Sequence, residues 1–197
     1  ELNLKLLISF DYGQRHVKEL DFAAICANTL DVELQVIDLT SVGRSLSGSA
    51  LTDDIPVPDG HYAKSNMTST IVPNRNAIML SVAYGVAAAR KLKQVATAVH
   101  GGDHFIYPDC RPPFIEAFNN MQTLALEGVG EIGIYTPFLN SNKRDIVLEG
   151  SRLGVPFEHT WSCYKGGDVH CGRCGTCVER QEAFALSGVI DPTMYKD

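Results

Sequence analysis

Four cysteines lie within fifteen residues near the end of the chain, with the spacing C-x7-C-x2-C-x2-C: Cys163, Cys171, Cys174 and Cys177. Disulfides between cysteines this close would be strained, and a cytosolic thiol pool would keep them reduced. Four thiolates around one tetrahedral ion satisfy the geometry, and the glycines between them allow tight turns. The spacing therefore predicts one structural zinc ion per chain, with four sulfur ligands and no open position.

The cysteines also allow other interpretations. An iron–sulfur cluster is the main alternative, because C-x2-C-x2-C also occurs in ferredoxins. There the fourth cysteine lies downstream and a proline follows, whereas here it lies upstream and no proline follows. His170 could replace one sulfur ligand, and four unrelated thiols would hold no metal. The other cysteines, Cys26 and Cys110, are expected to be buried thiols without a catalytic role.

Apolar runs of strand length alternate with segments of helical periodicity. The pattern predicts strands at 4–10, 33–39, 94–99 and 131–135, helices at 14–30, 76–91, 112–126, 142–153 and 178–186, and a long loop at 40–73. Such alternation implies right-handed crossovers and a parallel sheet, and hence an α/β sandwich. We expect a nucleotide-binding α/β domain over 1–160 and a zinc-binding segment with a C-terminal helix over 161–197.

Polar segments follow three of the predicted strands, at 11–16, 100–111 and 136–145. Ligands bind beyond the carboxyl ends of strands in open parallel sheets. We therefore expect these three segments to converge at one sheet edge, which favours an enzyme over a purely structural protein.

Two basic residues lie at the starts of predicted helices. Arg75 stands where a loop meets a helix N-terminus, a place where free N–H groups and the positive dipole end favour an anion. A plain helix start capped by Asn76 is an equally good interpretation. Lys143 is either a phosphate contact or a solvated surface charge.

Two carboxylates bracket an aromatic residue in the segment 100–111. Asp103 and Asp109 could accept ring N–H groups while Tyr107 offers a stacking surface, which would suit a purine-like heterocycle. An Asp-rich turn is the simpler interpretation. Arg15 and His16 could form a catalytic or binding pair, or His16 could be an ordinary residue at a helix start.

Charge and hydropathy exclude several protein classes. Seventeen Lys and Arg against 23 Asp and Glu give a net charge of -6, which argues against a protein that mainly holds a nucleic-acid backbone. No run of 18 apolar residues exists, and no secretion signal precedes the first strand. We expect a soluble, cytoplasmic protein.

Several motifs together resemble one family, the 7-cyano-7-deazaguanine synthases, which form preQ0 for queuosine biosynthesis. They occur in the family's order across essentially the whole chain: Phe10–His16, Val72–Asn76, Asp103 with Tyr107–Arg111, Asn142–Lys143, and the four-cysteine segment. The resemblance implies an adenine-nucleotide α-hydrolase-like fold of the PP-loop class, a homodimer and a structural zinc. It also implies conversion of 7-carboxy-7-deazaguanine and ammonia into the nitrile, driven by ATP with Mg²⁺.

The resemblance also assigns candidate site residues. Nucleotide contacts would come from Phe10, Tyr12, Gln14, Arg15, Asn74, Arg75 and Lys143. Contacts to the deazaguanine would come from Asp103, Tyr107, Asp109 and Arg111. The catalytic set would be Arg75, Lys143 and Asp103.

One family motif does not occur in the chain, the Ser-Gly-Gly-x-Asp-Ser loop that holds the nucleotide phosphates. The chain begins with Glu1 and enters a strand at once, so we expect this loop in a preceding segment. Two other functions stay open: a related PP-loop ligase with another substrate, including one that joins deazaguanine to a macromolecule, and an inactive binding module without the phosphate loop.

Overall fold

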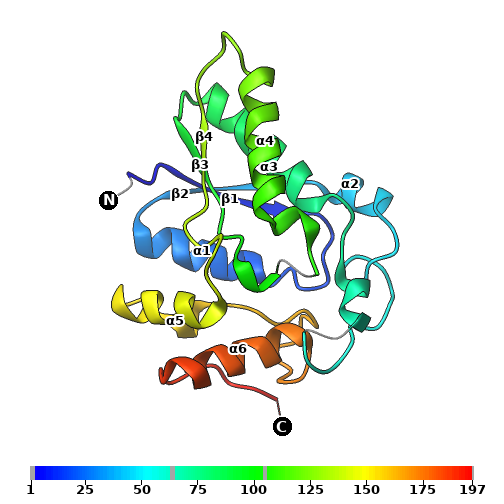
Figure 1. The fold of residues 1–197 in the computed structure, drawn as a ribbon. Helices are drawn as coiled ribbons and strands as arrows, with labels where there is room; N and C mark the ends of the chain where they lie inside the picture. Colours follow the sequence, from blue (N-terminus) through cyan, green and yellow to red (C-terminus); the bar gives the residue numbers. More distant parts are fainter. Residues whose placement is uncertain (1–2, 63–64, 104–105, 197) are drawn as a thin grey trace. The chain divides into compact units, whose positions relative to one another are not determined.

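Strands and helices alternate along the chain in the computed structural model (Figure 1). The structure describes residues 3–62, 65–103 and 106–196, without the side chains of Asn66 and Asp103. Its described strands pair in parallel, as two two-stranded sheets. The predicted α/β class with parallel strands is confirmed.

The chain divides into two compact units. Unit 1 comprises Glu1–Pro73 and Val147–Asp197, and unit 2 comprises Asn74–Ile146. The elements of unit 1 are β1 (Leu6–Asp11), α1 (Glu19–Leu30), β2 (Glu33–Asp38), α2 (Thr40–Ser45), η1 (Ser65–Thr70), η4 (Phe157–His159) and α6 (Gly175–Ser187). Those of unit 2 are α3 (Arg75–Ala89), β3 (Gln94–Ala96), η2 (Gly101–Asp103), η3 (Pro108–Cys110), α4 (Pro112–Ala125) and β4 (Gly133–Tyr135).

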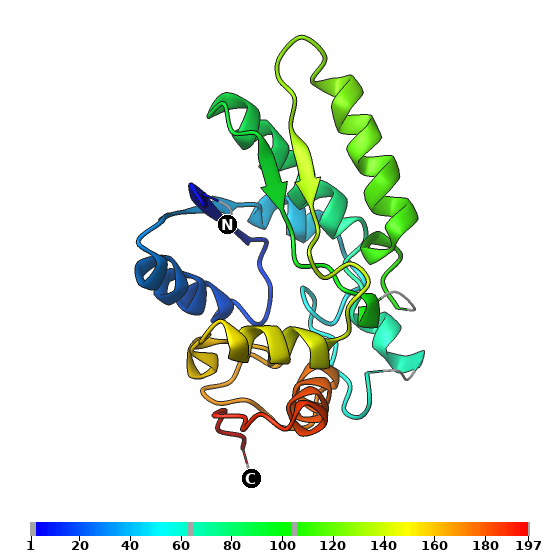
Figure 2. The same cartoon turned by 60° about the vertical axis from the view of Figure 1, so that its left-hand side comes forward.

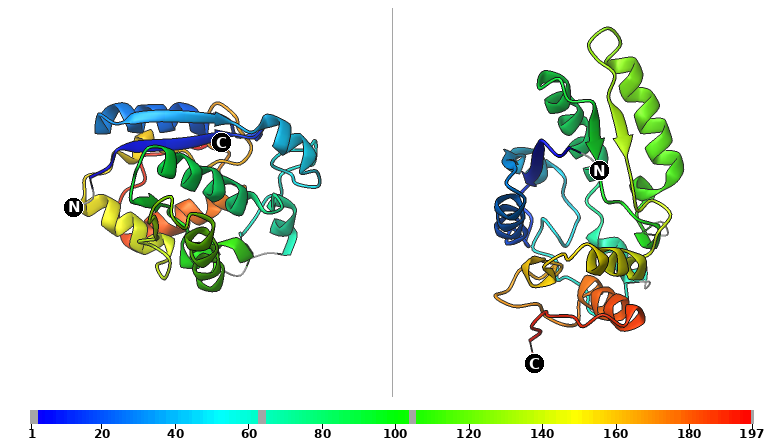
Figure 3. Two further views of the ribbon diagram at one scale, coloured as in Figure 1. Left: turned by 90° about the horizontal axis from the view of Figure 1, so that it is seen from above. Right: turned by 90° about the vertical axis from the view of Figure 1, so that its left-hand side faces the viewer.

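In unit 1, α1 connects β1 to its parallel neighbour β2 and runs along the pair (Figure 3). The predicted helix over 14–30 begins only at Glu19. The reason is that the Gln14 side chain binds the backbone on both sides of a turn: it accepts the Tyr12 N–H at 2.8 Å and donates to the Phe10 carbonyl at 2.9 Å. These contacts hold the chain after β1 out of a helical conformation.

The segment 40–73, predicted as a loop, contains two short helices, α2 and η1. Leu39 is the N-cap of α2, and the carboxylate of the preceding Asp38 accepts the N–H of Thr40, the first helical residue, at 2.8 Å. Hydrogen bonds from the side chain and backbone of Thr40 also lower the pKa of Asp38. With the sequence TSVGRS, α2 has no apolar periodicity, which is why the hydrophobic pattern did not predict it.

Unit 2 packs α3 and α4 with the short pair β3 and β4 (Figure 2). Tyr84 of α3 is fully buried; its hydroxyl donates to Asn119 of α4 at 3.1 Å, and its ring meets the edge of Phe118. Cys110 is buried in a cluster with Val99 and Ile115, as predicted. Cys26 is exposed on α1, so the prediction of a second buried thiol is wrong.

Helix α5 (Lys143–Arg152) begins in unit 2 and ends in unit 1. Asn142 and Asp145 form a reciprocal capping pair: the Asn142 side chain accepts the Asp145 N–H at 3.1 Å, and the Asp145 carboxylate accepts the Asn142 N–H at 3.2 Å. Asn142 therefore caps α5, which lies within the predicted helix over 142–153. Val147 of α5 packs with Ala183 and Phe184 of α6. None of the described helices combines the length and hydropathy needed to cross a bilayer.

Candidate functional site

The four cysteines form one compact cluster in unit 1. Their sulfur atoms all lie within 4.8 Å of one another, and the sulfurs of Cys171 and Cys177 are 3.9 Å apart. With Zn–S bonds of about 2.3 Å, a tetrahedral zinc ion needs sulfurs about 3.8 Å apart. The cluster therefore fits a single zinc ion. His170 is not among the residues whose ligand atoms gather in this cluster, and its Nε2 accepts the Ser162 N–H at 3.1 Å.

Backbone groups are arranged to favour thiolates in this cluster. The Cys171 N–H donates to the Cys163 sulfur at 3.4 Å, and the Cys174 N–H donates to the Cys171 sulfur at 3.2 Å. Helix α6 begins at Gly175, earlier than the predicted residue 178, so its positive end faces the cysteines. The hydrogen bond between the side chains of Cys163 and Cys174 lowers the pKa of the Cys174 thiol and raises the pKa of the Cys163 thiol to about 11.

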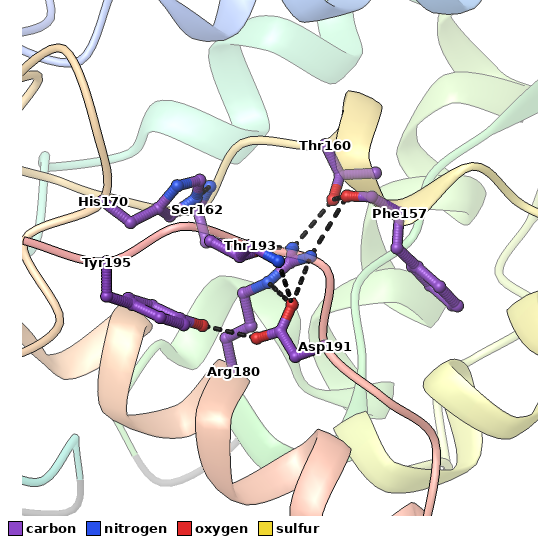
Figure 4. Close-up of polar contacts among 8 residues, drawn as sticks. All are labelled: Phe157, Thr160, Ser162, His170, Arg180, Asp191, Thr193 and Tyr195. Atoms are coloured by element: carbon purple, nitrogen blue, oxygen red, sulfur yellow. Dashed lines mark hydrogen bonds and ion pairs between the residues drawn. The ribbon is translucent and has the colours of Figure 1, made fainter.

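A buried ion pair connects the C-terminal tail to the cysteine segment (Figure 4). Arg180 of α6 lies 3.2 Å from Asp191, and their side chains are only 8% and 13% exposed. The same guanidinium donates to the Thr160 hydroxyl at 2.8 Å and to the Phe157 carbonyl at 3.2 Å. Tyr195 donates to the second oxygen of Asp191 at 2.6 Å. All groups of the pair are therefore hydrogen-bonded, as buried charges require.

The hydrogen bonds and charges around this pair shift the pKa values of Asp191 and His170. Burial alone would raise the pKa of Asp191, but hydrogen bonds from Tyr195, Thr193 and Arg180 lower it on balance. Burial, together with the positive charge of Arg180, lowers the pKa of His170 to about 4. Sequence reasoning missed the network, because nothing in the pattern indicates that Arg180 and Asp191 pair.

The end of β1 and the turn after it carry four of the predicted nucleotide contacts: Phe10 in the strand, and Tyr12, Gln14 and Arg15 in the turn. Tyr12 and Gln14 are buried, and the Gln14 amide fixes the backbone around both. The Arg15 guanidinium donates to the carbonyls of Asp53 at 2.8 Å and Ile55 at 3.2 Å. Arg15 therefore holds the segment after α2 to this turn.

The start of α3 in unit 2 brings two predicted site regions together. Asn74, in the left-handed conformation with φ 59°, is the N-cap, and Arg75 is the first helical residue. The interpretation of Asn76 as the cap is wrong: its N–H donates to the Asp109 carboxylate at 3.3 Å, and its side-chain amide donates to Cys110 Sγ at 3.4 Å. The segment after β3 is thereby fastened to the same helix end as Arg75.

The segments after β3 and β4 also meet in unit 2. The Gly101 N–H donates to the Ser141 carbonyl at 2.7 Å, two residues before Lys143 begins α5. Tyr107 packs on the apolar cluster of Val99, Cys110 and Ile115.

Two further predicted substrate contacts are Arg111 and Asp103. Arg111 is exposed at the start of α4. The side chain of Asp103 lies outside the described residues. Two of the three predicted segments are thus brought together in unit 2, while the segment after β1 belongs to unit 1.

Comparison with known proteins gives consistent results. The profile of a family described as "Queuosine biosynthesis protein QueC" matches residues 4–188. A 7-cyano-7-deazaguanine synthase of Rhizobium meliloti is 66% identical over 197 residues, covering 100% of this chain and 84% of the relative. The 7-cyano-7-deazaguanine synthase 1 of Mesorhizobium japonicum is 66% identical over 191 residues, covering 97% and 82%. One from Brucella anthropi is 64% identical over 197 residues, covering 100% and 85%.

Proposed function

The chain belongs to the QueC family of queuosine biosynthesis proteins, and on this basis we propose that it converts 7-carboxy-7-deazaguanine and ammonia into 7-cyano-7-deazaguanine with ATP and Mg²⁺. The observation that carries this proposal is the identity of 63–66% to curated 7-cyano-7-deazaguanine synthases over almost the whole chain. Neither a ligase with another substrate nor an inactive binding module is favoured by these relatives.

The reaction has a simple chemical logic. A carboxylate resists attack because its oxygens are anionic leaving groups. Adenylation by ATP turns one oxygen into a good leaving group, and ammonia then displaces it to give the amide. A second activation of the amide oxygen allows that oxygen to leave as the nitrile forms. The protein has mainly to position the reactants, neutralise phosphate charge and exclude water.

The candidate residues divide between these tasks. We assign the phosphates to Arg75 and Lys143, supported by the position of each in the first turn of a helix. Asn74 would shape the chain in front of Arg75. The adenine would lie at the turn after β1, against Phe10 and Tyr12, with Gln14 and Arg15 holding that turn.

The deazaguanine is assigned to the segment after β3. Asp103, Tyr107, Asp109 and Arg111 would hold it, with Asp103 also in the catalytic set. Support comes from Asp109, whose carboxylate reaches the backbone N–H of Asn76 at the start of α3 and so lies next to Arg75.

The remaining features follow from the family and the cysteine cluster. One structural zinc ion would be held by the four cysteines, which form a complete ligand shell. The protein would be a homodimer with the PP-loop type of α/β sandwich, its nucleotide-binding domain over 1–160 and zinc-binding segment over 161–197. We place it in the cytoplasm, where thiol ligands stay reduced.

Identification of the product tests the proposal. Purified protein is incubated with ATP, Mg²⁺, ammonia and 7-carboxy-7-deazaguanine, and the products are analysed by mass spectrometry. We expect the nitrile, and none of it without ammonia or ATP. A different nitrogen- or sulfur-containing product would favour a related ligase, and bound nucleotide without turnover would favour an inactive module.

The role of Arg75 can be tested in the same assay. Arg75→Ala should lower kcat about 100-fold, because a charged donor to the phosphates is lost. The control Arg152→Ala removes an exposed arginine that pairs with Glu149 on the surface of α5, and it should leave turnover unchanged. Full turnover of Arg75→Ala would contradict the assigned role.

A further inference from the structure

Two segments of unit 1 that lie about 150 residues apart in sequence are in close contact. We call residues 11–18 the strand turn and residues 163–177 the cysteine loop. Gly166 of the cysteine loop has φ +66°, and a Cβ on it would collide with the carbonyl oxygen of Arg15. Only glycine both adopts this conformation easily and allows the approach. The neighbouring Gly167 is different, because a Cβ there would meet only the Val169 carbonyl at 3.6 Å.

Side chains strengthen this backbone contact. Lys18 donates to the Asp168 carbonyl at 2.6 Å, and its ammonium lies 4.8 Å from the centre of the Trp161 ring. The rings of His16 and Tyr164 are 5.3 Å apart. The strand turn therefore has four contacts with residues 161–168: the close backbone approach at Gly166, the hydrogen bond from Lys18 to Asp168, the Lys18 ammonium over Trp161, and the ring contact of His16 with Tyr164.

On its other side the strand turn meets the segment after β2. A Cβ on Gly43 of α2 would collide with the Tyr12 carbonyl oxygen, and the Arg15 N–H donates to the Leu51 carbonyl at 2.8 Å. Because the turn is held between two segments, displacing either one changes its backbone. The cysteine loop is the one whose own conformation depends on its four sulfur atoms.

We infer that the cysteine loop positions the strand turn for nucleotide binding, with Gly166 as the positioning residue. This inference rests on the proposed function for the assignment of the turn to the nucleotide. The role of the metal site is then wider than local stabilisation, because it also fixes the backbone from Tyr12 to Arg15. Gly166 touches no reactant in this scheme and acts through Arg15.

The chain contains a natural reporter for this contact. Trp161 is the single tryptophan, and its indole donates to the Cys163 carbonyl at 2.9 Å. Its ring contacts Lys18 and also packs on Phe22 of α1, with ring centres 5.5 Å apart. Its fluorescence therefore reports whether the cysteine loop and the strand turn stay together.

The test compares Gly166→Ala with Gly167→Ala as the matched control. Zinc content, tryptophan fluorescence, hydrogen exchange of residues 11–18 and ATP affinity are measured for both. Gly166→Ala should keep its zinc but shift the fluorescence, raise exchange in the strand turn about tenfold and weaken ATP binding about tenfold, since a strained or displaced backbone costs that much. Gly167→Ala should match the wild type in all four readouts.

A second variant keeps the test valid if Gly166→Ala fails to fold. Lys18→Met retains an aliphatic side chain over Trp161 but removes the donor to the Asp168 carbonyl, and it should raise exchange in the strand turn about threefold. The inference would be overturned if residues 11–18 exchanged at the wild-type rate in a folded Gly166→Ala protein or in Lys18→Met. If wild-type protein binds no ATP, the proposed function fails, while the exchange readout still decides whether the cysteine loop positions the turn.

Discussion

The strand turn of unit 1 and the strand-end segments of unit 2 are held in place in different ways. The strand turn contacts segments far away in sequence, at Leu51 and at Gly166 in the cysteine loop. In unit 2, Gly101 bonds to Ser141, a sequence separation similar to that of Arg15 and Leu51, and the segment around Cys110 packs into an apolar cluster. The cysteine loop of unit 1 therefore depends on its sulfur cluster and on the buried ion pair beside it, whereas unit 2 depends on apolar burial.

This difference has a physical basis in the surfaces that each unit buries. Within the cysteine loop, the fully buried side chains are Cys163, Cys174 and Cys177, and large side chains that pack against them, such as Trp161 and Tyr195, come from outside the loop. In unit 2 the fully buried Tyr84 packs on Phe118, and each aromatic ring removes a large apolar area from water. A segment with little apolar area to bury needs a metal or another cross-link to stay folded.

The largest effect should come from loss of a sulfur ligand. Cys174→Ser should release the zinc and cost about 5 kcal/mol or more of the free energy of unfolding of unit 1, because metal binding supplies folding free energy. Circular dichroism during heating and the zinc content check this. Cys26→Ser is the matched control, since Cys26 is exposed on α1, and it should change neither value. Retention of full stability by Cys174→Ser would contradict the dependence of unit 1 on its sulfur cluster.

Breaking the buried ion pair should have the next largest effect. Asp191→Asn should lower the free energy of unfolding by about 3 kcal/mol at pH 7, because Arg180 is left buried without its partner charge. Denaturant unfolding measures this. Glu149→Gln, which breaks the exposed pair with Arg152, should cost about 0.5 kcal/mol or less.

The effect of Asp191→Asn should also depend on pH, with a sign that follows from the lowered pKa of Asp191. A carboxyl whose pKa is lower in the folded protein stabilises it fully above the ordinary value of about 3.9. This stabilisation is lost as the pH falls through the folded-state pKa. The difference between wild type and variant should therefore shrink below about pH 4. A difference that grows in acid would contradict this role of Asp191.

The smallest effect is expected in unit 2. Tyr84→Phe removes the hydrogen bond to Asn119 but keeps the ring, and it should cost about 1 kcal/mol. The cost should be the same with and without a zinc chelator, as measured by hydrogen exchange of α3 and α4. A cost that changes on chelation would show that unit 2 also depends on the metal site.

Patterns of spacing and periodicity predicted much of this molecule. The cysteine spacing led to the sulfur cluster, the apolar runs to β1 and β2, and the helical periodicity of 142–153 to α5. In each of these the signal lies within a few neighbouring residues, so no knowledge of distant contacts is needed.

The features that sequence reasoning missed depend on side-chain contacts. Gln14 delays α1 through hydrogen bonds to the backbone, which hydrophobic periodicity does not register. Arg180 and Asp191 resemble ordinary surface charges until the fold buries them together. The need for glycine at Gly166 comes from Arg15, far away in sequence.

The most direct test of this account is peptide-resolved hydrogen exchange of the wild-type protein before and after zinc is removed with a chelator. We expect residues 11–18 to lose protection together with residues 163–177, while residues 75–89 and 112–125 keep theirs. If the cysteine loop opened and residues 11–18 stayed protected, the strand turn would be independent of the metal site, and the account would be wrong.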